Sequence, residues 1–93
     1  MVVVNEESLE KLKDLSFKPQ YNIDTGELNE YVLRNIILVE KIKNPYNDIA
    51  APVWKIYVSK YAETETVVNT LFDMFKLGIC KKIESESDLL ERP

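Results

Sequence analysis

Residues 1–24 combine one short amphipathic segment with a polar stretch. Leucines spaced three residues apart, with charged residues between them, predict a short helix over residues 6–15. Asn5 occupies its N-cap position, where a side-chain oxygen accepts a hydrogen bond from a free backbone N–H. Residues 16–24 include Pro19 and several polar residues, so we expect an extended connector on the surface.

A long apolar segment follows over residues 28–43. Residues 24–27, with the sequence DTGE, match a capping box, which opens a helix. Apolar residues then recur at helical spacing, at Leu28, Val32, Ile36 and Val39. A strand is the competing interpretation, because residues 36–39 are all apolar and mostly β-branched. The segment is about three times as long as a usual strand and Pro45 follows it, so we predict a helix at the centre of the fold.

Residues 52–61 are predicted to form a second, shorter helix. Asn47 or Asp48 can cap it, and its first turn tolerates Pro52. An apolar stripe at helical spacing is expected to face the core, and its members are Val53, Trp54, Tyr57, Val58 and Tyr61. A strand also suits this segment, because Trp54, Ile56 and Val58 alternate with more polar residues. The interpretation of the whole fold depends on this element.

A third predicted helix covers residues 65–77. Thr64 can cap it, acidic residues in its first turn suit the helix dipole, and Gly78 is the natural residue after its last turn. A wide apolar face is expected to be buried, and it contains Val67, Val68, Leu71, Phe72, Met74 and Phe75. Phe72 and Phe75 are expected in the core, and a dimer contact is the alternative that so many apolar residues on one helix leave open. Residues 79–84 are then predicted to form a strand, residues 85–88 a turn and residues 89–92 a second strand.

The length and composition suit one domain in a reducing compartment. With only two glycines and no low-complexity segment, residues 1–93 are treated as one unit, with an N-terminal helix and connector over 1–25 and a core over 26–93. The lone Cys80 suits a reducing compartment. Because we see neither a signal-peptide pattern nor an apolar run of bilayer length, we predict a cytoplasmic protein without a membrane segment.

The net charge of −4 is unevenly distributed along the chain. Residues 1–30 carry three basic and seven acidic residues (net −4), residues 31–60 five and two (net +3), and residues 61–93 four and seven (net −3). An acidic chain argues against a polyanionic partner. Exposed charges are largely screened beyond about 8–10 Å, however, so the local charge decides whether a phosphate can dock. The basic middle of the chain therefore leaves DNA binding open.

The predicted order from residue 28 onward is a long helix, a shorter helix, a third helix, a glycine, a basic strand and a polar turn, and this order is that of a winged helix-turn-helix. From Thr66 onward the sequence TVVNTLFDMFKLGICKKIESESD resembles the recognition helix and first wing strand of MarR- and PadR-type regulators. The matching positions are Thr66-Val67, Leu71, Met74, Gly78-Ile79 and Lys81-Lys82. The match is good over about 25 residues, looser over residues 31–61 and absent before them. It implies a mainly α winged helix-turn-helix domain, with an extra N-terminal helix and a short β wing, that binds double-stranded DNA sequence-specifically.

The resemblance also implies which residues contact DNA. The exposed side of the 65–77 helix would enter the major groove, which admits one helix, while neighbouring lysines would meet phosphates. The predicted DNA-binding residues are Lys43, Tyr46, Lys55, Lys60, Tyr61, Thr64, Thr66, Asn69, Thr70, Lys76, Lys81 and Lys82. The sequence departs from the family pattern at Glu63, Glu65 and Asp73, which put carboxylates near the DNA, and in having no arginine on the reading helix.

Two classes of function follow from these patterns. The first is DNA binding in transcription regulation or in plasmid or chromosome partition. The small size and extra helix also resemble the AspA-type adaptors of archaeal plasmid segregation, which implies a homodimer on a centromere and a ParB-like partner protein. The second class is a winged-helix protein–protein interaction module that does not bind DNA. We predict no enzyme, catalytic residue, metal or cofactor, because the chain has no histidine, one cysteine and no glycine-rich phosphate loop.

Overall fold

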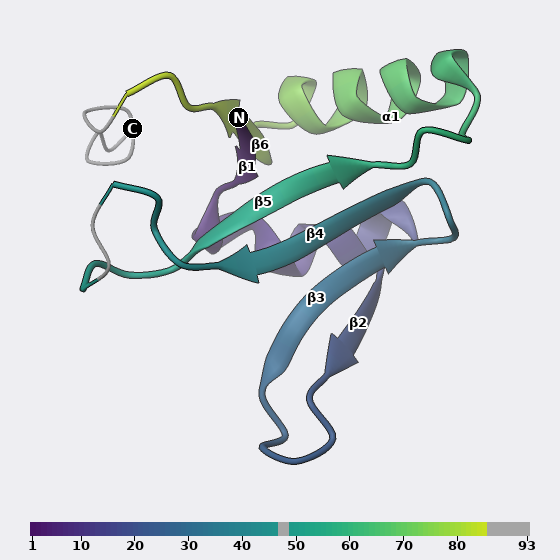
Figure 1. The fold of residues 1–93 in the computed structure, drawn as a ribbon. Coiled ribbons are helices and arrows are strands. Elements are labelled where there is room, and N and C mark those ends of the chain that lie inside the picture. The colour runs from purple at the N-terminus through teal and green to yellow at the C-terminus, as the bar shows by residue number, and fades with distance from the viewer. Residues whose placement is uncertain (47–48, 86–93) are drawn as a thin grey trace.

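The computed structural model describes residues 1–46 and 49–85, and these form an antiparallel sheet with two helices (Figure 1). The strands are β1 (Val2–Val4), β2 (Lys18–Tyr21), β3 (Leu28–Leu33), β4 (Ile37–Ile42), β5 (Val53–Val58) and β6 (Cys80–Lys82). The helices are η1 (Glu6–Leu15), a 3₁₀ helix, and α1 (Thr64–Lys76). The strand order is β2-β3-β4-β5-β1-β6, and every neighbouring pair is antiparallel.

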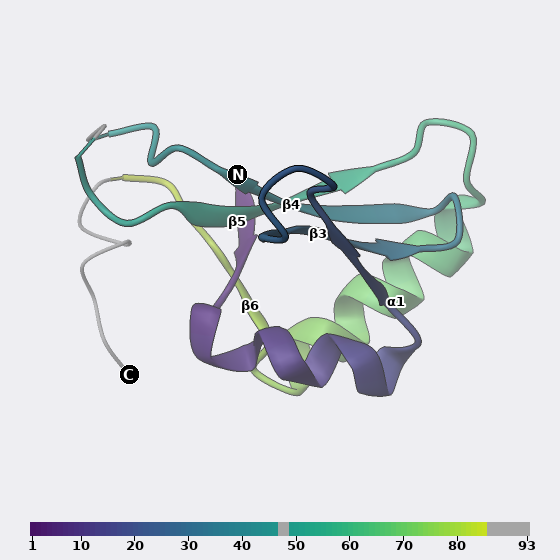
Figure 2. The same ribbon diagram turned by 90° about the horizontal axis from the view of Figure 1, so that it is seen from below.

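Both helices lie on the same face of the sheet, and the core lies between these two layers (Figure 2). Leu12 of η1 and Met74 of α1 are fully buried there against Tyr31 of β3 and Val39 of β4. On the other face of the sheet, Val3 and Val53 form a smaller apolar cluster with Ile83. The architecture is therefore a two-layer α+β fold whose sheet has one open face.

The predicted mainly α winged helix-turn-helix fold is wrong, and the largest error lies in residues 28–43. This segment is a hairpin of β3 and β4, in which Tyr31 pairs with Val39. Leu28 and Val32 are four residues apart, and this spacing places side chains on one face of a strand as well as of a helix, because four is an even number. The next apolar residue of the pattern, Ile36, lies in the turn between the two strands, so the remaining spacings did not report a helix. The length of the apolar segment reflects two strands that follow each other in the chain.

The turn between β3 and β4 interrupts the segment at Arg34. Arg34 has a left-handed backbone, with φ of 49°, and the N–H of Ile36 donates to the carbonyl of Leu33 at 3.0 Å. Most residues other than glycine avoid this conformation. Neither glycine nor proline marks this turn, and Asn35 is its only residue of a type that turns favour, so the local signal for a reversal of the apolar segment is weak.

The predicted capping box at residues 24–27 is instead the turn between β2 and β3. The side-chain oxygen of Asn22 accepts hydrogen bonds from the N–H groups of Asp24 and Thr25, at 2.8 and 3.0 Å. Gly26 supplies a positive φ of 73°, and its N–H donates to the carbonyl of Asn22. The residues at 16–24 that we expected to form an extended connector thus contain an edge strand, β2.

Residues 52–61 are also not a helix, because β5 occupies most of this segment. Its Ile56 pairs with Val39 of β4 and its Trp54 with Val4 of β1. Two neighbouring strands satisfy the backbone hydrogen bonds of β5 from both sides, which a prediction from local sequence cannot include. The alternation of Trp54, Ile56 and Val58 was the informative signal for this strand.

Three predicted elements near the chain ends are confirmed. Residues 6–15 are helical as η1, residues 65–77 form α1 to within a residue of each end, and β6 lies within residues 79–84. Gly78 follows α1 with φ of 72°, as expected. The predicted cap at Asn47 or Asp48 lies outside the described residues, as do the strand at 89–92 and most of the turn at 85–88.

Asn5 is at the N-cap position of η1, as predicted, but its side chain makes no capping hydrogen bond, and the predicted N-cap of α1 at Thr64 is wrong. The side chain of Asn5 does not cap η1, and its Nδ2 instead donates to the carbonyl of Gly78 at 3.0 Å. Glu63, not Thr64, occupies the N-cap position of α1. Asn5 therefore ties the start of η1 to the turn that follows α1.

Among the described residues, no helix is both long and apolar enough to span a membrane.

Candidate functional site

Helix α1 carries more apolar surface than the sheet covers. Val67 and Met74 are buried and Leu71 is partly buried, as predicted. Phe72, which was expected to be buried with them, is 62% exposed. Two more residues of the predicted buried face are also exposed, Val68 at 55% and Phe75 at 45%. The prediction that all six apolar residues are buried is therefore wrong for three of them.

The three exposed residues lie on one side of the helix. Val68, Phe72 and Phe75 are related by spacings of four and three residues, which place them on one stripe of an α-helix. We call this stripe the α1 patch. It flanks the buried side of the helix, since Leu71, next to Phe72, is partly buried in the core. The core face of α1 thus continues directly into an exposed apolar stripe.

Charged residues lie at the two ends of the α1 patch. Glu65 is in the first turn of α1, and Glu63 precedes it at the N-cap position. Lys76 is in the last turn, and its ammonium nitrogen lies 5.7 Å from the centre of the Phe72 ring. A cation at this distance is attracted to the face of the ring. The stripe is therefore acidic at one end and basic at the other.

Thr66 and Thr70, two of the predicted DNA-contacting residues of α1, lie on the flank opposite the α1 patch, whereas Asn69 borders the patch three residues before Phe72. The hydroxyl of Thr70 donates to the carbonyl of Thr66 at 2.8 Å, and the hydroxyl of Thr66 donates to a Glu63 carboxylate oxygen at 3.5 Å. Thr64 is the first residue of the helix and is exposed. Asn69 is exposed as well. Two of the three hydroxyls therefore already bond within the helix, and a carboxylate accompanies them.

The predicted phosphate-contacting residues are spread over different parts of the molecule. Lys55 is on β5, with its ammonium 4.7 Å from the Tyr57 ring centre. Lys60 lies after β5, 5.2 Å from the ring centre of Tyr61. Lys82, in β6, makes an ion pair with Glu84 at 3.1 Å, and Lys81 precedes it in that strand. The register places Lys55 and Lys81 on the same face of the sheet, on either side of Val3, but Glu40 lies beside Lys55 and Glu84 pairs with Lys82.

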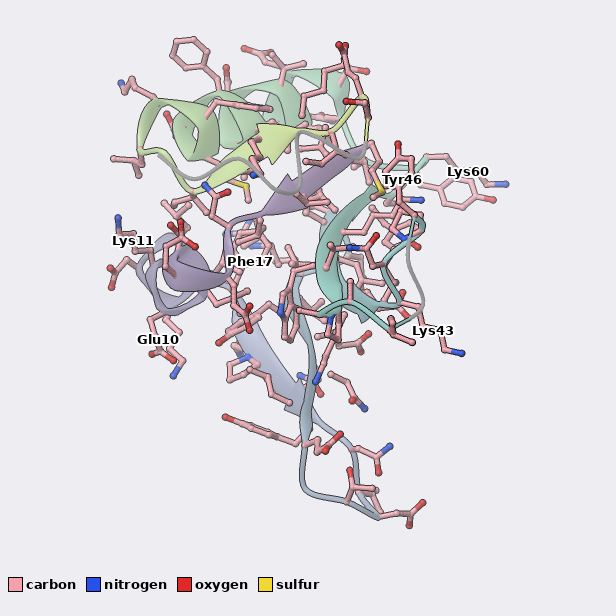
Figure 3. All side chains as sticks on the ribbon, turned by 90° about the vertical axis from the view of Figure 1, so that its left-hand side faces the viewer. Glu10, Lys11, Phe17, Lys43, Tyr46 and Lys60 are labelled. Atoms are coloured by element: carbon pink, nitrogen blue, oxygen red, sulfur yellow. The ribbon has the colours of Figure 1, made fainter. Side chains whose placement is uncertain are left out.

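Two further predicted residues, Lys43 and Tyr46, lie after β4. Figure 3 shows Lys43 and Lys60 projecting on one side of the molecule, and Glu10 and Lys11 of η1 on the other. The N–H of Tyr46 donates to the side-chain oxygen of Asn44 at 2.9 Å, so a local turn fixes the backbone there. Two lysines from the basic middle of the chain therefore project on the same side of the molecule, away from η1.

The open face of the sheet carries charges of both signs. The register places Glu30 beside Glu40, and Glu40 beside Lys55. Glu30 and Glu40 also line an open groove of about 600 Å³ on this part of the sheet, together with Lys41 and Lys43. Two adjacent carboxylates oppose a polyphosphate chain, because like charges repel. The open face is therefore less suited to a nucleic acid than the number of its lysines suggests.

The aromatic stripe predicted in residues 52–61 is only partly in the core. Trp54 is buried, and its ring centre lies 6.1 Å from that of Tyr31, with the two planes tilted by 59°. Tyr57 and Tyr61 are exposed, Tyr61 by 87%. In a strand, successive side chains point to opposite faces, so Trp54 and Tyr57 cannot both point inward. The prediction that Tyr57 and Tyr61 pack in the core is wrong.

The one cysteine lies in the core layer. Cys80 is buried on β6, and burial raises the pKa of its thiol to about 11. A thiol with such a pKa is protonated at neutral pH, whereas the thiolate is the nucleophile and metal ligand. The part of the chain that the structure describes contains no cluster of histidine, cysteine and acidic residues that could hold a metal ion. Cys80 therefore serves as a small apolar residue.

The sequence pattern predicted a core position for the residues of the α1 patch, with a dimer contact at Phe72 and Phe75 only as the alternative. The signal for this surface was the width of the apolar face, since six apolar residues in 67–75 cover more of the helix than one sheet can bury.

Comparisons of the chain with protein-family models, with curated proteins and with solved structures find no match.

Proposed function

We propose that this chain is a non-catalytic, cytoplasmic protein-binding module that uses the α1 patch as its docking surface. The observation that carries this proposal is the exposure of Phe72, Val68 and Phe75 on one stripe of α1. Exposed apolar side chains scattered singly are normal, but contiguous patches rimmed by polar residues mark interaction sites. Aromatic residues are also the ones most enriched at the centres of protein interfaces.

The rigidity of α1 supports the same function. Met74 and Val67 anchor the helix on the sheet, and Gly78 ends it in a left-handed turn tied to Asn5. An exposed stripe on an anchored helix loses little conformational entropy when a partner docks, which favours binding. Phe72 and Phe75 also have few rotatable bonds, so little side-chain entropy is lost with them.

DNA binding is not the function that we propose. It was predicted from a winged helix that the fold does not contain, and its candidate residues are scattered or accompanied by carboxylates. The roles in transcription regulation and partition, and the ParB-like partner, stay predictions from the sequence alone. The expected absence of a DNA interface can be tested directly.

In a fluorescence-polarisation titration with duplex DNA, we expect no saturable binding at low salt and no dependence on salt. Each phosphate neutralised by a lysine would instead lower log K by about 0.9 per unit of log salt. A negatively charged chain whose candidate lysines stand beside carboxylates, as Lys55 does beside Glu40 and Lys82 beside Glu84, offers few such contacts. Saturable binding with a slope of several phosphates, lost on Lys60→Ala, would contradict this expectation.

Photo-crosslinking from the α1 patch tests the proposed function itself. A photoreactive phenylalanine analogue placed at Phe72, in cells of the native host, is expected to give a discrete covalent protein adduct. The matched control is the same analogue at Asp73, which is also exposed on α1 but is not three or four residues from any member of the patch. No adduct from Phe72, or equal adducts from both positions, would contradict a docking surface at the patch.

A further inference from the structure

We infer that the occupant of the α1 patch is a second copy of this chain, which pairs its own α1 antiparallel to the first about a twofold axis. This inference rests on the proposed function, because it names the partner of that same surface. Closed homodimers with twofold symmetry are the commonest assemblies, and their interface must be complementary to itself. The α1 patch meets this requirement in both shape and charge.

The apolar part of the patch is suited to self-pairing. In an antiparallel pair centred near Phe72, the stripe of one copy lies along the stripe of the other. Val68, at one end, then meets the region of Phe75, at the other end, so a smaller side chain faces a larger one. Two exposed stripes of this kind bury each other along their whole length, which removes the apolar side chains of both copies from water.

The charges at the ends of the stripe select the antiparallel direction. In that arrangement the acidic start of one α1, with Glu63 and Glu65, approaches Lys76 at the end of the other. A parallel pair would instead place acids beside acids and Lys76 beside Lys76. The helix dipoles also favour antiparallel packing, since their positive and negative ends then face each other. A partner of unrelated sequence would need to reproduce both features.

The area of the patch predicts a reversible dimer of moderate affinity. From the exposed fractions of Phe72 (62%), Phe75 (45%) and Val68 (55%), the stripe offers roughly 300 Å² in each copy. A stable interface buries about 1,200–2,000 Å² in total, so the surrounding polar residues must supply part of it. We therefore expect monomer and dimer to exchange, with a dissociation constant in the micromolar range.

Sedimentation equilibrium of the full chain, from about 1 µM to about 1 mM, tests the inference. We expect the average mass to rise from monomer to dimer across this range. Phe72→Glu and Val68→Glu should each raise the dissociation constant at least about tenfold, because a charge would be buried in the contact. Asp73→Lys, which changes a charge on the opposite flank of the same helix, should leave it unchanged. Circular dichroism checks that all variants are folded.

Charge reversal tests the direction of pairing. Glu65→Lys and Lys76→Glu should each weaken the dimer, and the double variant should recover most of the affinity, because it restores opposite charges across the axis. Both losses of dimer affinity should shrink at high salt, since these charges lie at the exposed rim of the interface. A double variant no stronger than the weaker single one would overturn the antiparallel arrangement.

The outcomes separate this inference from the proposed function. A chain that stays monomeric to 1 mM, while the analogue at Phe72 crosslinks to a protein of another mass, overturns the second copy as occupant and leaves the docking surface standing. A monomeric chain without any crosslink from Phe72 overturns both. A dimer that survives both Phe72→Glu and Val68→Glu uses another surface and also overturns the inference.

Discussion

Replacing Trp54 by alanine is expected to lower the free energy of unfolding by about 3–5 kcal/mol. Trp54 is 5% exposed on β5, next to the central strand β4, and packs in the core with Tyr31. The substitution removes the largest side chain of this cluster and leaves a cavity that flanking strands cannot close without breaking their ladders. Since Trp54 is the only tryptophan, urea unfolding should be followed by circular dichroism.

The matched control for Trp54→Ala is Tyr57→Ala in the same strand. Tyr57 points to the open face and is 38% exposed, so its replacement should cost less than about 1 kcal/mol. A helix over residues 52–61 would instead place both rings on one buried stripe, and the two losses would then be similar. Equal losses for the two variants would therefore contradict the strand and its orientation.

Replacing Met74 by alanine is expected to cost about 2–5 kcal/mol of unfolding free energy. Met74 is fully buried beneath the sheet, and it is the residue of α1 that reaches furthest into the core. Phe72→Ala, two residues away, should cost less than about 1 kcal/mol although it removes a larger side chain, because Phe72 is exposed. The comparison shows by stability alone which side of α1 faces the sheet.

Thermal and urea unfolding of these two variants must be measured at low protein concentration. If the chain dimerises through the α1 patch, Phe72→Ala also removes the stabilisation that association provides at high concentration. The expected pattern is a loss for Phe72→Ala that grows with concentration, and a loss for Met74→Ala that does not depend on it. A concentration-independent loss of several kcal/mol for Phe72→Ala would place its ring in the core.

The sequence by itself determined those elements whose local pattern is compatible with only one type of secondary structure. Residues 64–76 are helical because acids at the start, apolar residues at helical spacing and Gly78 at the end all favour the same structure. Residues 6–15 are helical for a similar reason. Local sequence also located β6, since apolar and polar residues alternate directly after Gly78. In each case the information lies within about 15 residues of the chain.

Tertiary structure decided the middle of the chain and, with it, the fold class. Residues 28–33, 37–42 and 53–58 are strands because β3, β4, β5 and β1 complete one another's hydrogen bonds, and β5 finds one of its two partners, β1, at the far end of the chain. Tyr31 and Val39 became core residues through that pairing. A periodicity shared by helix and strand cannot distinguish them until the partners are known.

The candidate site depended on tertiary structure even more strongly. The sequence identified every residue of the α1 patch as apolar and placed it on the correct helix. It could not show which apolar residues the sheet would cover, because the width of a buried face is set by the position of α1 over the sheet. Met74 is buried and Phe72 is exposed for that geometric reason, since exposure is a property of the packed layers rather than of the residue.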